Sequence, residues 1–174
     1  MAGRLRAVEL AAVFSSPLQR AHDTAYAIAA PHGLAVHEEE DLTEMDHGQW
    51  CGLLRAEVEH KFAPVLRHWY EHPASVQMPG GESLAQVHQR AAAALQRILA
   101  AHPGGGVVVC THDVVLKVLV ADVLGMDLDL FWSLRLDNAS LSVVDYTDRG
   151  PALVSLNDTC HLGEYRSDLR AQAL

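Results

Sequence analysis

Apolar and polar positions along the chain follow two alternating patterns. Uninterrupted short apolar runs occupy residues 10–15 and 107–111, and a weaker run occupies residues 34–37. Runs of this kind are typical of parallel strands that are covered on both faces. Two later runs, 140–146 and 152–156, flank turn residues and predict an antiparallel pair. Strands that alternate with helical stretches predict a layered α/β fold with a mostly parallel sheet.

The helical stretches carry start signals of one type. Ser16 with Gln19, and Ser83 with Gln86, have the spacing of a capping box, so we expect a helix directly after each serine. Pro17 would be the first residue of the earlier helix. Two short helices are expected within 53–71, and another over about 113–124, where Gly125 caps it. Residues beyond Cys160 show no clear period.

Composition narrows the class of protein. The chain has 174 residues, which predicts one domain over 1–174, and its net charge of −9 argues against a nucleic-acid or membrane-surface binder. Three cysteines without a Cys-x-x-Cys spacing argue against a disulfide framework or a zinc ribbon. We therefore expect reduced thiols, a cytoplasmic location and no membrane span.

Two predicted strand-to-helix junctions carry candidate chemistry, because ligands of open α/β sheets bind at the carboxyl ends of strands. Arg20 follows the first junction and has the planar guanidinium that suits a phosphate; an exposed arginine beside a good cap is the equally weighted alternative. His112 follows the second junction, where an imidazole can donate to a phosphoryl oxygen or transfer protons. A core histidine, with Asp113 as an ordinary helix cap, is the alternative there.

A third candidate lies in the predicted loop over residues 38–52. Glu44 is a carboxylic acid in this loop, and an apolar neighbour such as Trp50 would raise its pKa and suit it to act as a general acid. Acidic residues precede it, so a solvated acidic loop is the favoured interpretation of this segment taken by itself.

Taken in order, the segments SSPLQRA (15–21), LTEMDHGQWCG (42–52), PGGES (79–83) and VVVCTHDVV (107–115) resemble the histidine phosphatase superfamily, the phosphoglycerate-mutase-like enzymes. The resemblance covers about residues 5–146. It implies a three-layer α/β/α fold and metal-independent phosphoryl chemistry without a cofactor, in which a histidine forms a phosphohistidine intermediate. It further implies that Arg20, His112 and the N–H of Asp113 bind the phosphoryl group, with Glu44 and His112 as catalytic residues.

Several positions depart from the family pattern. The nucleophile of the family belongs to an Arg-His-Gly motif that precedes the first strand matched here, and the fourteen residues before Ser15 include no histidine. We therefore expect that the first central strand is missing and that Met1 is not the native start or the chain is a fragment. Cys51 stands where Glu is frequent, Asp113 where glycine is frequent, and Lys117 where arginine is frequent.

Three functions follow from the resemblance and its departures. The first is a phosphoric monoester hydrolase acting on a small phosphorylated metabolite, with no nucleic-acid or membrane partner and a homodimer as an open possibility. The second is a non-catalytic remnant that binds phosphorylated ligands, which the absent nucleophile supports. The third is a phosphoglycerate-mutase-type isomerase, which needs the same histidine.

Overall fold

The computed structural model describes residues 1–163 and divides the chain into two compact units. The first unit contains Met1–Glu44 and Gln89–Leu116. The second contains Met45–His88 and the chain from Lys117 onward. The single domain expected over 1–174 stays a prediction, and most of the uncertain tail, residues 164–174, lies outside the described residues.

The first unit is built on a three-stranded parallel sheet. Strands β1 (Ala12–Ser15), β2 (Val36–Glu38) and β3 (Val107–Cys110) pair in the order β2-β1-β3. Ser15 is in register with Glu38 on one side and with Cys110 on the other. The carboxyl ends of all three strands therefore meet at one edge of the sheet, as expected for a parallel α/β sheet. Strand β2 begins two residues later and ends one residue later than the strand predicted over 34–37.

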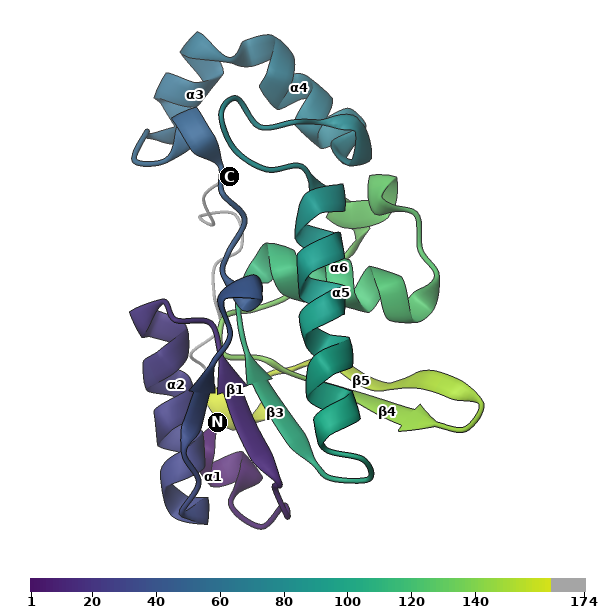
Figure 1. The fold of residues 1–174 in the computed structure, drawn as a ribbon. Helices are drawn as coiled ribbons and strands as arrows, with labels where there is room; N and C mark the ends of the chain where they lie inside the picture. Colours follow the sequence, from purple (N-terminus) through teal and green to yellow (C-terminus); the bar gives the residue numbers. More distant parts are fainter. Residues whose placement is uncertain (164–174) are drawn as a thin grey trace. The chain divides into compact units, whose positions relative to one another are not determined.

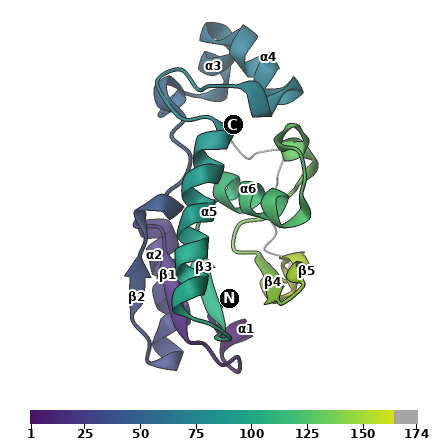
Figure 2. The ribbon, with the colours of Figure 1, turned by 45° about the vertical axis from the view of Figure 1, so that its right-hand side comes forward.

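Helices cover both faces of this sheet. Helix α2 (Gln19–Ala29) packs against all three strands, and the short α1 (Ala2–Leu5) packs against α2. The part of α5 (Leu84–Ala101) that belongs to this unit lies on the opposite face (Figure 2). The crossover from β1 to β2 and the crossover from β2 to β3 run in opposite directions across the sheet, so right-handed connections place α2 and α5 on opposite faces. The buried stripe on α2 is the predicted one, with Ala21, Ala25, Ile28 and Ala29.

The start of α2 differs from the prediction. The helix begins at Gln19 with Leu18 at its N-cap position, and no side chain caps it. The hydroxyl of Ser16 accepts a weak bond from the N–H of Leu18 at 3.3 Å and lies 2.8 Å from an imidazole nitrogen of His112. The capping box predicted for Ser16 and Gln19 is therefore wrong, because the Ser16 hydroxyl is hydrogen-bonded to His112 at the end of β3.

The capping box at α5 is confirmed. The backbone N–H of Ser83 donates to Oε1 of Gln86 at 2.8 Å, and the N–H of Gln86 donates back to the Ser83 hydroxyl at 3.3 Å. These reciprocal bonds satisfy backbone donors that a helix start otherwise leaves without partners.

The second unit combines short helices with a hairpin (Figure 1). Helices α3 (Arg55–Lys61) and α4 (Ala63–Glu71) pack against each other, as predicted for residues 53–71. Strands β4 (Leu141–Thr147) and β5 (Gly150–Asp158) form the predicted antiparallel pair. Helix α6 (Asp113–Leu124) begins in the first unit and ends in the second. In the second unit its residues Val120 and Ala121 form a buried apolar cluster with Leu134.

The segment after Glu44 is held closely against the PGGES segment. The N–H of Gln49 donates to the carbonyl of Pro79, and the N–H of Glu82 donates to the carbonyl of Asp46, both at 2.8 Å. A Cβ added to Gly48 would lie 2.3 Å from the Pro79 carbonyl oxygen, and the φ of Gly48 is +55°. Only glycine allows the two segments to approach this closely.

Candidate active site

His112 lies at the carboxyl end of β3 and directly precedes α6. Its residue is 6% exposed, and Nε2 lies 2.8 Å from the hydroxyl oxygen of Ser16, which follows β1. The two strands that carry these residues are neighbours in the sheet. Parallel pairing therefore brings together two side chains that are 96 positions apart in the sequence.

The hydroxyl of Ser16 has partners on two sides. It accepts the N–H of Leu18, and it shares a hydrogen bond with Nε2 of His112 in which the direction of donation follows the tautomer of the imidazole. In the tautomer protonated on Nδ1, Ser16 donates its hydrogen to Nε2.

The surroundings of His112 favour its neutral form. Burial, together with the positive charges of Arg20 and Arg90, lowers the pKa of His112 from 6.5 to about 4. At neutral pH the imidazole is therefore uncharged beside two guanidinium groups. An anion that entered this environment would offset both cations and favour protonation of His112.

Arg20 is exposed in the first turn of α2, and its charge acts on His112. A helical side chain in the first turn lies near the end of the helix where backbone N–H groups are unpaired. The structure therefore places the arginine of the SSPLQRA segment and the histidine of the VVVCTHDVV segment at the same edge of the sheet.

Glu44 is half-buried and ends the segment that follows β2 in the first unit. The guanidinium of Arg90 donates to the backbone carbonyl of Asp41 at 2.8 Å and to that of Glu44 at 3.4 Å. The hydroxyl of Thr111, next to His112 in sequence, donates to the carbonyl of Leu42 at 2.6 Å. Side chains from α5 and from the end of β3 thus hold the backbone that carries Glu44.

The remaining site candidates divide between the two units. Asp113 is the first residue of α6, so its backbone N–H is at a helix N-terminus, where anions are favoured. Lys117 and Trp50 belong to the second unit. Lys117 Nζ lies 4.7 Å from the ring centre of Phe131, and the buried Trp50 ring packs near Phe62.

Three histidines outside the His112 site lie in or beside short helices: His32, His47 and His68. Nδ1 of His47 lies 3.0 Å from the carbonyl of Met45, and Nε2 of His68, on α4, lies 2.8 Å from the Ser75 hydroxyl. His32 ends a short 3-10 turn before Gly33, which has a φ of +66° as expected for the predicted cap. Within residues 1–163, no three His, Cys, Asp or Glu side chains are grouped to hold a metal ion.

Sequence analysis missed two residues of this site, Ser16 and Arg90. The spacing of Ser16 and Gln19 fits a helix cap, so the local sequence offered no reason to expect the bond from Ser16 to His112. Arg90 lies on a long amphipathic helix, where a polar residue is normally solvated. Its position seven residues after Ser83 of the PGGES segment is the only sequence feature that sets it apart.

Cys51, Cys110 and Cys160 are free thiols, and burial raises the pKa of Cys110 to about 12. Across residues 1–163, no helix combines the length and hydropathy needed to cross a lipid bilayer.

Comparison with known proteins connects this site to a family. The model of the histidine phosphatase superfamily (branch 1) matches residues 1–159. Phosphoserine phosphatase 1 of Hydrogenobacter thermophilus is 41% identical over 165 residues, which cover 95% of this chain and 78% of the relative. The bifunctional protein Rv2228c of Mycobacterium tuberculosis is 38% identical over 154 residues, 88% of this chain but 42% of the relative.

Solved structures agree with these matches. YhfR of Bacillus stearothermophilus has a TM-score of 0.88 and 30% identity, covering 92% of this chain and 80% of its own. A mycobacterial glucosyl-3-phosphoglycerate phosphatase crystallised with VO3 has a TM-score of 0.80 and 25% identity, covering 90% of this chain and 80% of its own. The shared fold and the family match over most of the chain lead to one conclusion: this chain belongs to the histidine phosphatase superfamily, branch 1.

Proposed function

We propose that this chain supplies the site of a metal-independent hydrolase that removes the phosphoryl group from a small phosphorylated metabolite through a phosphohistidine. The observation that carries the proposal is neutral His112, which lies beside Ser16 within the field of Arg20 and Arg90. A dianion bound here would offset the charges of both arginines. Two relatives act, by their names, on phosphoserine and on glucosyl-3-phosphoglycerate, which are small phosphate monoesters.

Each proposed role follows from the chemistry of its residue. Arg20 would bind two phosphoryl oxygens through its planar guanidinium, and the N–H of Asp113 would bind a third. His112 would donate a hydrogen bond to a phosphoryl oxygen as negative charge builds up there during transfer. These groups stabilise the phosphoryl group during transfer, and a separate nucleophile forms the bond to phosphorus.

Glu44 would transfer the protons of the reaction. In the first step a histidine nitrogen bonds to phosphorus, the ester P–O bond breaks, and the Glu44 carboxyl protonates the departing oxygen. In the second step the Glu44 carboxylate takes a proton from water as the water oxygen bonds to phosphorus and the P–N bond breaks. Inorganic phosphate and the neutral imidazole of the nucleophile are the products.

The absent Arg-His-Gly motif favours a second function, in which the same residues bind a phosphorylated ligand without turning it over. The printed sequence holds no Arg-His-Gly, so no histidine matches the nucleophile of the family by motif. Binding and turnover therefore have to be measured separately.

The test combines a turnover assay with adduct mapping. The chain is incubated with para-nitrophenyl phosphate, and the reaction is quenched in base, where phosphohistidine survives, for peptide mass mapping. The hydrolase proposal predicts release of para-nitrophenol, a phosphohistidine at one position, and a large loss of rate in Glu44→Gln. Vanadate binding without either product supports the non-catalytic function, and absence of vanadate binding contradicts both.

A further inference from the structure

The guanidinium of Arg90 hydrogen-bonds two backbone carbonyls of the acid-bearing segment. Nη1 donates to the carbonyl of Asp41 at 2.8 Å, and Nη2 donates to that of Glu44 at 3.4 Å. Two nitrogens of one planar group therefore span a stretch of four residues. Such a fork fixes the direction of the backbone, which a single point contact cannot do.

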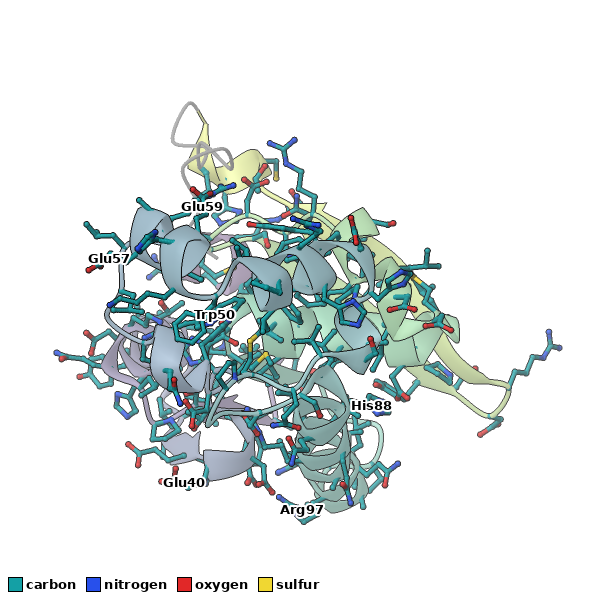
Figure 3. The ribbon with its side chains drawn as sticks, turned by 90° about the horizontal axis from the view of Figure 1, so that it is seen from above. Glu40, Trp50, Glu57, Glu59, His88 and Arg97 are labelled. Atoms are coloured by element: carbon teal, nitrogen blue, oxygen red, sulfur yellow. The ribbon has the colours of Figure 1, made fainter. Side chains whose placement is uncertain are left out.

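The same segment has two further attachments within the first unit. Thr111 holds the carbonyl of Leu42 from the end of β3, and Arg97 binds the carboxylates of Glu39 at 3.0 Å and Asp41 at 2.7 Å. Arg97 lies on the solvent-facing side of α5, and its side chain is 53% exposed (Figure 3). Its ion pairs are therefore screened, whereas Arg90 is half-buried.

Arg90 also acts on His112. Its charge is one of the two cations that oppose protonation of the imidazole. Arg90 thus contacts the backbone of the proposed acid, Glu44, and also influences the protonation of His112. Neither effect requires Arg90 to touch the substrate.

We propose that Arg90 is a positioning residue, which fixes the backbone at Glu44 and supplies a second cation to the His112 site. The inference rests on the proposed function, because it concerns the placement of the acid and the histidine of that reaction. It assigns Arg90 two separable contributions, the forked geometry of its guanidinium and its positive charge.

Two substitutions separate these contributions. Arg90→Lys keeps the charge and loses the fork, whereas Arg90→Met loses both and keeps most of the apolar side chain. Arg97→Gln is the matched control, because it removes an arginine from the same helix that binds the same segment through side-chain carboxylates. Three readouts are taken: the His112 titration by NMR, vanadate affinity by calorimetry, and amide exchange at Leu42 and Thr43, whose N–H groups close turns to residues 39 and 40.

The proposal predicts a different pattern for each variant. In Arg90→Met the pKa of His112 rises toward the ordinary value, vanadate binds about two- to fivefold more weakly, and both amides exchange faster. In Arg90→Lys the pKa of His112 stays low, while the amides of Leu42 and Thr43 still exchange faster than in the unsubstituted chain. Arg97→Gln leaves the His112 titration as it is in the unsubstituted chain.

Failure of this inference differs from failure of the proposed function. An unchanged His112 titration in Arg90→Met, or a raised pKa in Arg90→Lys, overturns the role of the charge. Unchanged amide exchange in both variants overturns the role of the fork. Absence of vanadate binding in the unsubstituted chain contradicts the proposed function instead, and it leaves the His112 titration and amide exchange as independent measures of Arg90.

Discussion

At the scale of single residues, the hydroxyl of Ser16 shows how a tertiary partner overrides a local one. The serine precedes a helix and has a glutamine three positions later, which is the local signature of a cap. In the fold the hydroxyl instead lies 2.8 Å from Nε2 of His112. No local rule could predict this, because the partner arrives through pairing of β1 with β3.

The buried His112 makes stability depend on pH. Its pKa is about 4 in the folded chain, against an ordinary value of 6.5 that applies in the unfolded chain, so between these values the unfolded chain binds more protons. The free energy of unfolding therefore decreases as the pH falls through this window, by up to about 3 kcal/mol in total.

Denaturant unfolding at pH 7 and pH 4.5 tests this expectation in the unsubstituted chain and in His112→Gln. The variant should lose less stability between the two pH values, because it has no imidazole at this position. Equal losses in both chains would show that His112 is not the residue responsible.

The thiol of Cys110 should be protected from modification. Burial raises its pKa to about 12, so almost no thiolate is present at pH 8, whereas Cys51 and Cys160 are exposed. Titration with a thiol-reactive chromophore should show two fast thiols and one slow thiol in the folded chain. In denaturant all three should react at similar rates, and three fast thiols in the folded chain would contradict the burial of Cys110.

At the scale of elements, the sequence pattern predicted the type of every main helix and strand but not each boundary. The α5 start was predictable because Ser83 and Gln86 satisfy each other within one turn. The α2 start was not, because β3 supplies the competing partner of Ser16. Arg20, Glu44, His112 and Asp113 could be named from four motifs, whereas Arg90 is evident only from its bonds to the carbonyls of residues 41 and 44.

The close approach of the 46–50 and 78–82 segments makes a prediction about Gly48. An alanine Cβ there would lie 2.3 Å from the Pro79 carbonyl oxygen in a backbone with φ of +55°. We expect Gly48→Ala to destabilise the chain by about 3 kcal/mol or more.

Gly52 is the matched control for this substitution. Its φ is +78°, but an added Cβ would meet nothing within 4 Å, so Gly52→Ala should cost only about 1 kcal/mol for the left-handed backbone. Chemical denaturation measures both losses, and equal losses in the two variants would contradict the importance of the close approach.

At the scale of the whole molecule, two long helices connect the two compact units through the chain. Residues 84–88 of α5 belong to the second unit and the rest to the first, while α6 begins in the first and ends in the second. Local unfolding of either unit would therefore break both helices within their length. We expect the units to unfold together, in keeping with the predicted single domain.

Tryptophan fluorescence tests this cooperativity. All three tryptophans, Trp50, Trp69 and Trp132, belong to the second unit, so fluorescence reports on that unit while far-ultraviolet circular dichroism reports on both. The two signals should follow one denaturation curve with one midpoint. Separate midpoints would show that the units unfold independently.

The central claim is that His112 belongs to a phosphoryl-binding site, and NMR titration of its imidazole with and without inorganic phosphate tests this most directly. In the free chain His112 should titrate near pH 4, far below the ordinary histidine value. Bound phosphate should raise this pKa, because the dianion favours the imidazolium. A His112 that titrates near 6.5 in the free chain, or whose pKa is the same with saturating phosphate, would contradict the account.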